Sequence, residues 1–91
     1  MKRVLIVDVD PENLKTISHV IESKTSLCQV YTAQDGIEAI ELVKKNKLDL
    51  VITSLELPGV DGFELLIKLN RFRPDVKVIV MTSAKSDMVK A

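Results

Sequence analysis

The sequence is poor in the residues that mark several classes of protein. It has a single cysteine, Cys28, so no disulfide can form within the chain, and this favours a reducing compartment. It has only three glycines, and none lies between the first apolar run and the amphipathic stretch that follows it. A glycine-rich phosphate loop is therefore missing, which argues against a small nucleotide- or flavin-binding α/β enzyme. A bound flavin would also colour the purified protein.

The chain also lacks an excess of one charge and long apolar runs. Thirteen Lys and Arg balance thirteen Asp and Glu, so net charge gives no reason to expect binding to nucleic acid or to an anionic membrane. No apolar run approaches the roughly 20 residues that cross a bilayer. The apolar run from Val4 to Val7 ends in an acid and is too short for a signal peptide. We therefore expect a cytoplasmic protein with no membrane contact and no nucleic-acid partner of its own.

The residues that are present have an ordinary globular composition and an alternating pattern. The chain is 46% hydrophobic and 29% charged, and its length fits one small domain, residues 1–91. Short apolar runs alternate with stretches whose apolar residues recur at helical spacing, which predicts a parallel sheet with right-handed crossovers, a doubly wound α/β fold. The expected strands are 4–7, 27–32, 49–53 and 76–81, and the expected helices cover about 11–23, run from 36 onward, and run from the 58–62 loop to about 73.

Individual side chains in these elements have predicted places. Asp10, Asp35 and Asp61 precede the three helices and are expected to cap them. His19 is expected at the surface. The expected core comprises Leu14, Ile17, Val20 and Ile21 in the first helix, Ile37, Ile40, Leu42 and Val43 in the second, Phe63, Leu66, Ile67 and Leu69 in the third, Cys28, and the whole fourth strand.

Polar side chains follow three of the predicted strands. The first strand ends in Asp8-Val9-Asp10, the third in Thr53-Ser54 and the fourth in Thr82-Ser83. Ligands bind open parallel sheets at the carboxyl ends of the strands, so these groups would share one rim. Carboxylates at this rim could hold a hard cation such as Mg²⁺, and hydroxyls beside the cation could bind a phosphate.

Four separated motifs resemble those of the receiver domains of bacterial two-component response regulators. They are Leu5 to Pro11, Thr32 to Ala39, Asp49 to Gly62, and Thr82 to Ala84. The motifs fall in the right order on the right elements, which makes the resemblance specific, and it extends over all 91 residues. It implies the CheY-like, flavodoxin-like fold, a parallel sheet in the order 2-1-3-4-5 with helices on both faces.

The resemblance also implies a phosphorylation site, and this chain departs from it. The family's phosphoacceptor aspartate falls on Ser54, and the acid that ligates Mg²⁺ most directly falls on Val9. The family's phosphate-contacting lysine follows a fifth strand, which these residues do not supply. Asp8 and the main-chain carbonyl of Glu56 remain as residual, weak metal ligands, because Mg²⁺ gives up water reluctantly. Thr82 remains as the hydroxyl that switches position when a phosphoryl group arrives.

Each of these residues also has a plainer interpretation. Asp8 is either a residual metal ligand or a solvated acid at a strand end. Asp10 either replaces the missing acid or, as its place before Pro11 favours, caps the helix. Ser54 is either the target of a separate kinase or a small hydroxyl that fills the vacated site. Thr82 is either a switch or an inherited strand end.

The sequence predicts a protein-interaction module and not an enzyme. We expect a receiver-like signalling domain with no catalytic residue and no resident cofactor beyond weakly bound Mg²⁺. Its partners would be a histidine kinase or a downstream effector, contacted without phosphorylation, since a serine hydroxyl at position 54 is a poor nucleophile unless a base or a metal activates it. A working phosphoacceptor with weak Mg²⁺-dependent phosphate binding is the first alternative, and a nucleotide- or flavin-binding protein is the second.

The fourth strand is predicted to be an open edge of the sheet. Without a fifth strand, Val76 to Met81 is an apolar edge with one charge, a template for pairing with another chain. Without the family's last helix, only the first helix would cover one face of the sheet. We expect that a chain truncated after strand 4 either belongs to a longer protein or forms a homodimer or a domain swap through this edge.

Overall fold

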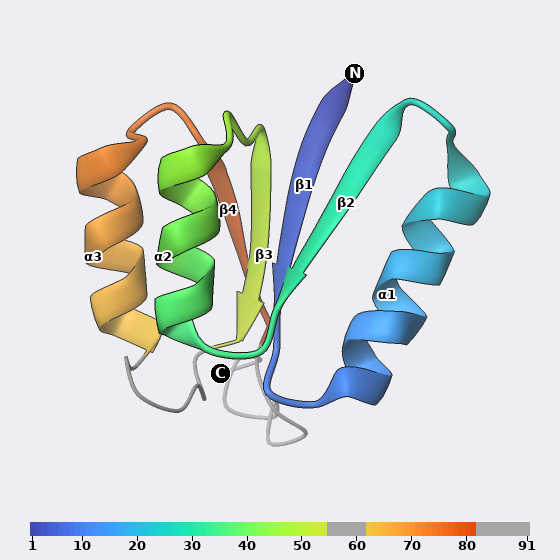
Figure 1. The fold of residues 1–91 in the computed structure, drawn as a ribbon, viewed down its shortest axis with the longest axis horizontal. Coiled ribbons are helices and arrows are strands. Elements are labelled where there is room, and N and C mark those ends of the chain that lie inside the picture. The colour runs from blue at the N-terminus through green and yellow to red at the C-terminus, as the bar shows by residue number, and fades with distance from the viewer. Residues whose placement is uncertain (55–61, 82–91) are drawn as a thin grey trace, which may run out of the picture.

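The computed structural model describes residues 1–54 and 62–81, which form one parallel sheet with helices on both faces (Figure 1). The sheet order is β2-β1-β3-β4, and each neighbouring pair is parallel. The predicted doubly wound α/β fold is therefore confirmed, with element boundaries within two residues of those expected. In chain order the elements are β1 (Lys2–Val7), α1 (Pro11–Lys24), β2 (Cys28–Ala33), α2 (Gly36–Lys45), β3 (Leu50–Ser54), α3 (Gly62–Phe72) and β4 (Lys77–Met81).

The central strand β1 is buried on both faces. Leu5 and Val7 belong to the core cluster shared with α2 and α3, and Val4 and Ile6 belong to the cluster shared with α1. A strand covered on both faces gains apolar burial at every position, which explains why its sequence is a continuous apolar run. The larger cluster, on the α2–α3 side, comprises Leu5, Val7, Ala33, Ala39, Val43, Leu48, Val51, Leu65 and Leu69.

On the opposite face, α1 is the one helix among the described elements (Figure 1). Its buried residue is Leu14, and Ile17 and Ile21 pack against the same cluster while partly exposed. Val20 was expected in this stripe, but half of its surface is exposed. Cys28 was expected to be fully buried, and it is instead half-buried against the α1 cluster. His19 is exposed, as predicted. No described helix is both long and apolar enough to span a membrane.

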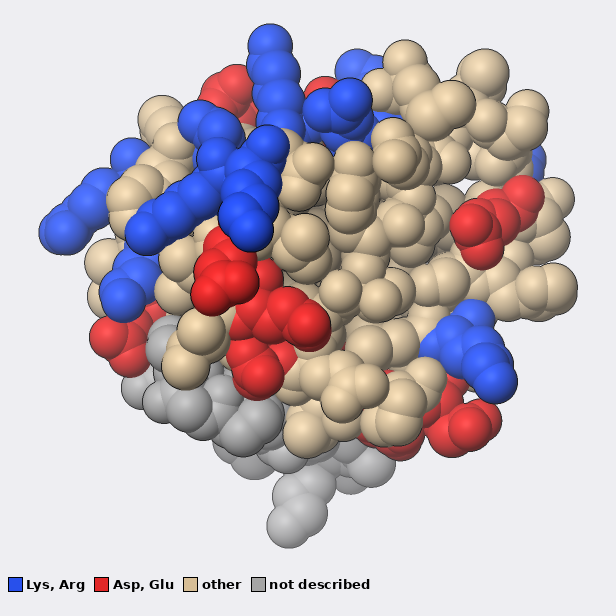
Figure 2. Space-filling view, viewed as in Figure 1, with Lys and Arg blue, Asp and Glu red and all other residues tan. Residues whose placement is uncertain are grey.

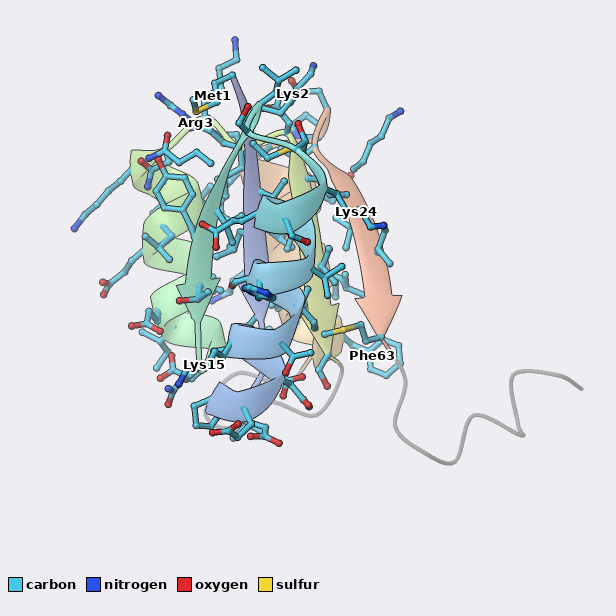
Figure 3. The ribbon with its side chains drawn as sticks, turned by 90° about the vertical axis from the view of Figure 1, so that its right-hand side faces the viewer. Met1, Lys2, Arg3, Lys15, Lys24 and Phe63 are labelled. Atoms are coloured by element: carbon cyan, nitrogen blue, oxygen red, sulfur yellow. The ribbon has the colours of Figure 1, made fainter. Side chains whose placement is uncertain are left out.

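The predicted cores of α2 and α3 were wrong at three positions. Ile37 is 55% exposed, Phe63 67% and Ile67 62%, and Figure 3 shows Phe63 on the outside of the molecule. Each residue turns a helix by about 100°, so the face of α3 that holds Leu65 and Leu69 turns positions 63 and 67 away from the sheet. Apolar residues at most positions of α3 made the inward face ambiguous in the sequence.

Strand β4 was predicted both as a buried strand and as an edge, and only the second prediction is confirmed. It pairs with β3 at one end of the sheet order. Lys77 through Val80 are exposed in the described part of the chain, with Ile79 at 52%. Burial failed as a prediction because an apolar run shows that a strand can be covered, and not whether a neighbour covers it.

Lysine and arginine gather over the carboxyl-terminal ends of α2 and α3 (Figure 2). Lys44 and Lys45 lie in the last turn of α2 and Arg71 in the last turn of α3, where the helix dipole favours cations. The Lys44 ammonium also lies 4.9 Å from the centroid of the Phe72 ring, which adds a cation–π contact between the two helices. The helix dipole and the contact with Phe72 therefore explain why Lys44, Lys45 and Arg71 lie at these helix ends.

Alanine substitutions at two positions of α3 test which face of this helix points into the core. Replacing Leu65, which is completely buried, with alanine should lower the free energy of unfolding by about 2–5 kcal/mol. Replacing Ile67, which is 62% exposed, should change it by no more than about 0.5 kcal/mol. Urea unfolding followed by circular dichroism measures both variants. Equal losses for the two variants would contradict the assigned orientation of α3.

Candidate functional site

The register of the sheet brings the first and third strand ends together. Val7 of β1 pairs with Thr53 of β3, so Asp8 and Ser54 are the next residues on neighbouring strands. Ser54 in turn pairs with Met81 of β4. The predicted rim at the carboxyl ends of the strands therefore exists, and it unites Asp8 with Ser54. The other predicted site residues, Glu56 and Thr82, and the predicted cap Asp61 lie outside the described residues.

Asp8 is buried, and each of its carboxylate oxygens accepts a hydrogen bond. Its residue is 8% exposed, and its main-chain N–H donates to the Ala33 carbonyl at 3.1 Å, which continues the β1–β2 ladder. Its Oδ1 accepts from the Asp10 N–H at 3.0 Å, and its Oδ2 accepts from Asn13 Nδ2 at 3.2 Å. The interpretation of Asp8 as a solvated acid is therefore wrong, because Asp8 lies directly after the end of β1, is 8% exposed and accepts hydrogen bonds from the start of α1.

Asn13 is a site residue that the sequence did not single out. It lies in the first turn of α1, five residues after the acid whose carboxylate it contacts. An asparagine near a helix start is ordinarily explained by capping, so its type alone gave no signal. Only the path of the loop between β1 and α1 brings the Asn13 amide to the end of β1.

Asp10 and Asp35 cap their helices, as predicted. The Asp10 side chain accepts from the Glu12 N–H at 2.9 Å, and Pro11 follows at the first helical position. The Asp35 side chain accepts from the Glu38 N–H at 2.7 Å, and the Glu38 carboxylate accepts from the Gln34 N–H at 2.8 Å. The Asp10 carboxylate thus caps α1, which disfavours the alternative that it ligates Mg²⁺ in place of the acid expected at position 9.

The two positions at which the sequence predicts a departure from the family, Val9 and Ser54, carry uncharged side chains near Asp8. Val9 is 51% exposed and offers no ligand atom on its side chain. Ser54 is half-buried at the end of β3, and its main-chain carbonyl accepts from the Thr53 hydroxyl at 3.1 Å. The predicted site therefore presents one carboxylate and one serine hydroxyl among its described residues.

The resemblance to receiver domains implies bound Mg²⁺, an ion with strict requirements for its ligands. Mg²⁺ prefers near-ideal octahedral oxygen ligation and usually needs more than one carboxylate or a substrate phosphate. In residues 1–54 and 62–81 no three His, Cys, Asp or Glu residues are grouped so that they could hold a metal ion. The predicted site holds one carboxylate among its described residues, Asp8, and each of its oxygens already accepts one hydrogen bond, so this donor set by itself is too small for Mg²⁺. Residual binding by Asp8 with Glu56 stays a prediction.

Comparisons with known proteins bear on the fold and the family. The sporulation initiation phosphotransferase F of Bacillus subtilis is 30% identical over 90 residues, which are 98% of this chain and 71% of that protein. The response regulator GacA of Pseudomonas aeruginosa is 34% identical over 96% of this chain, which spans only 41% of its length. The response regulator TrrA of Thermotoga maritima, solved in complex with Mg²⁺–BeF, matches with a TM-score of 0.84 and 28% identity, covering 97% of this chain and 76% of that one.

The family match extends over nearly the whole chain. The profile described as the response regulator receiver domain matches residues 4–91. The strand order 2-1-3-4 found in the structure is the order that the resemblance implied. The resemblance read from the four sequence motifs is therefore confirmed: this chain belongs to the response regulator receiver domain family of two-component signalling.

Proposed function

We propose that this receiver domain contacts its signalling partners without being phosphorylated. The observation that carries the proposal is the pair of substitutions at the rim. Ser54 stands where the family has its phosphoacceptor aspartate, and Val9 stands where the family has its main metal-binding acid. The chain would therefore act as a binding module between a histidine kinase and an effector, and not as an enzyme.

The chemistry of phosphoryl transfer supports this proposal. Transfer requires a nucleophile held in line with the phosphorus and a cation that neutralises the phosphoryl oxygens. A serine hydroxyl needs a base or a metal to activate it. The one histidine of the chain, His19, is exposed on α1, and Asp8 is occupied by the Asp10 N–H and the Asn13 amide. Position 54 therefore lacks the carboxylate on which the family forms its acyl phosphate.

Incubation with a small phosphodonor tests the proposal. With acetyl phosphate and millimolar Mg²⁺, the intact mass of this chain should stay unchanged, because no carboxylate stands at position 54. The Thermotoga maritima response regulator, which has been solved with Mg²⁺–BeF, is the positive control and should gain a phosphoryl group. A phosphoryl adduct on this chain, lost in the Ser54→Ala variant, would refute the proposal and place the modification on Ser54.

We also propose that the β4 edge binds a second copy of this chain. In the described structure β3 is the strand that pairs with β4, and the side chains of β4 that follow Lys77 are apolar. Val78, Ile79 and Val80 are 36%, 52% and 37% exposed. A two-fold-related β4 would run antiparallel to this one, extend the sheet through main-chain hydrogen bonds, and cover these side chains in an isologous contact.

Sedimentation equilibrium tests the edge contact. The wild-type chain should sediment as a dimer, and Ile79→Lys should weaken the dimer by about tenfold or more, because it places a charge in the paired edge. The control is Val20→Lys on α1, a valine that is 50% exposed, and it should leave the dimer unchanged. A wild-type monomer at high concentration, or equal weakening by both variants, would contradict the contact.

A further inference from the structure

We infer that Asp8 serves this chain as an internal anchor, held by Asn13 and the main chain of Asp10, and not as a metal ligand. The two hydrogen bonds tie the end of β1 to the first turn of α1. In this chain the two N–H donors are the partners of the carboxylate, whereas in a metal-binding rim Mg²⁺ is its partner. The inference rests on the proposed function, since a rim that receives no phosphate has no need of the cation.

Asp8 is a buried carboxylate at the end of β1. A carboxylate that is 8% exposed must have hydrogen-bond partners, because an unpaired buried charge is strongly unfavourable. Asp8 has one donor on each oxygen, at 3.0 Å from the Asp10 N–H and 3.2 Å from Asn13 Nδ2. The amino-terminal end of α1 also lies next to this carboxylate, and the helix dipole there favours a negative charge. Asp8 is therefore stabilised without a cation.

A cation that binds Asp8 directly would have to displace one of these hydrogen-bond donors. Inner-sphere Mg²⁺ on Oδ2 would compete with the Asn13 amide, and the neighbouring Val9 offers no carboxylate in return. The nearest other acid, Asp10, already accepts from the Glu12 N–H and caps α1. An ion that keeps its water reluctantly and finds one engaged carboxylate gains little from binding. The described donors thus favour the Asn13 contact over the metal.

The hydrogen bond from Asn13 to Asp8 can be distinguished from an effect of Asn13 on the stability of α1 alone. Asn13 donates from its side chain to a residue outside α1, so its effect on stability must depend on Asp8. Lys15, which is exposed two residues later and labelled in Figure 3, belongs to the same helix and provides the matched control. Removing a side chain that only favours the helix would act equally with or without Asp8. Removing one that anchors Asp8 would not.

A double-mutant cycle tests the anchor. Asn13→Ala should lower the midpoint of thermal unfolding, Lys15→Ala should leave it unchanged, and the loss from Asn13→Ala should vanish in an Asp8→Ala background. Should Asp8→Ala fail to fold, Asp8→Leu takes its place, since it keeps a side chain of similar length and removes both acceptor oxygens. Additive losses from positions 8 and 13 would overturn the anchor.

Magnesium provides the second arm of the test. The wild-type chain is titrated with MgCl₂ and, at matched ionic strength, with KCl, while the backbone amides of Asp8, Val9 and Asp10 are followed by NMR. We expect no saturable shift specific to Mg²⁺. Saturable shifts that Asp8→Asn abolishes would make Asp8 a metal ligand and overturn the inference. Phosphorylation of Ser54, by contrast, would refute the proposed function and leave the Asp8–Asn13 coupling as measured.

Discussion

The structure depends on β1, a central strand that is buried on both faces. Leu5, Ile6 and Val7 are completely inaccessible, and they pack in opposite directions against α1 and against the α2–α3 layer. β1 also pairs with both β2 and β3, so its position fixes where their carboxyl ends lie. Because the strand emerges from the core at Asp8, this residue is held at a fixed point with its carboxylate partly enclosed. The packing of β1 in the core therefore fixes the positions of the residues at the rim.

A receiver rim built on such a strand keeps its shape when its chemistry changes. Val9 and Ser54 carry no carboxylate, while the hydrogen bonds that orient Asp8 and begin α1 come from within the chain. The start of α1 and the end of β1 are therefore joined by hydrogen bonds from within the chain. The proposed function assigns contact with other proteins to the exposed edges and faces, and not to a change of state at the rim.

The sequence was a good guide to the sheet because its signals are local. The apolar runs placed the strands, and Asp10 and Asp35 marked two helix starts with side chains that accept from nearby main-chain N–H groups. The inward face of α3 was not predictable from the same pattern. Its residues 62–67 are apolar at nearly every position, so Phe63 and Ile67 fit a buried stripe as well as Leu65 does, and only the sheet decides between them.

The site was predicted in part, for a related reason. Register placed Asp8 and Ser54 together once the strands were known, because parallel strands end at one rim. The burial of Asp8 and its contact with Asn13 were missed, since they depend on how the chain turns from β1 into α1. The half-exposed side chains of β4 were missed as well, because a strand's sequence does not state which neighbours cover it.

The central claim is that the rim no longer forms a phosphate site, and a phosphoryl mimic tests it most directly. The measurement is a titration with Mg²⁺ and beryllofluoride, following the backbone amides of Asp8 and Ser54 by NMR. The account predicts that neither amide shifts at millimolar ligand. Saturating shifts at both amides would show that the rim still assembles a metal–phosphate site, and the phosphorylation-independent function would then be wrong.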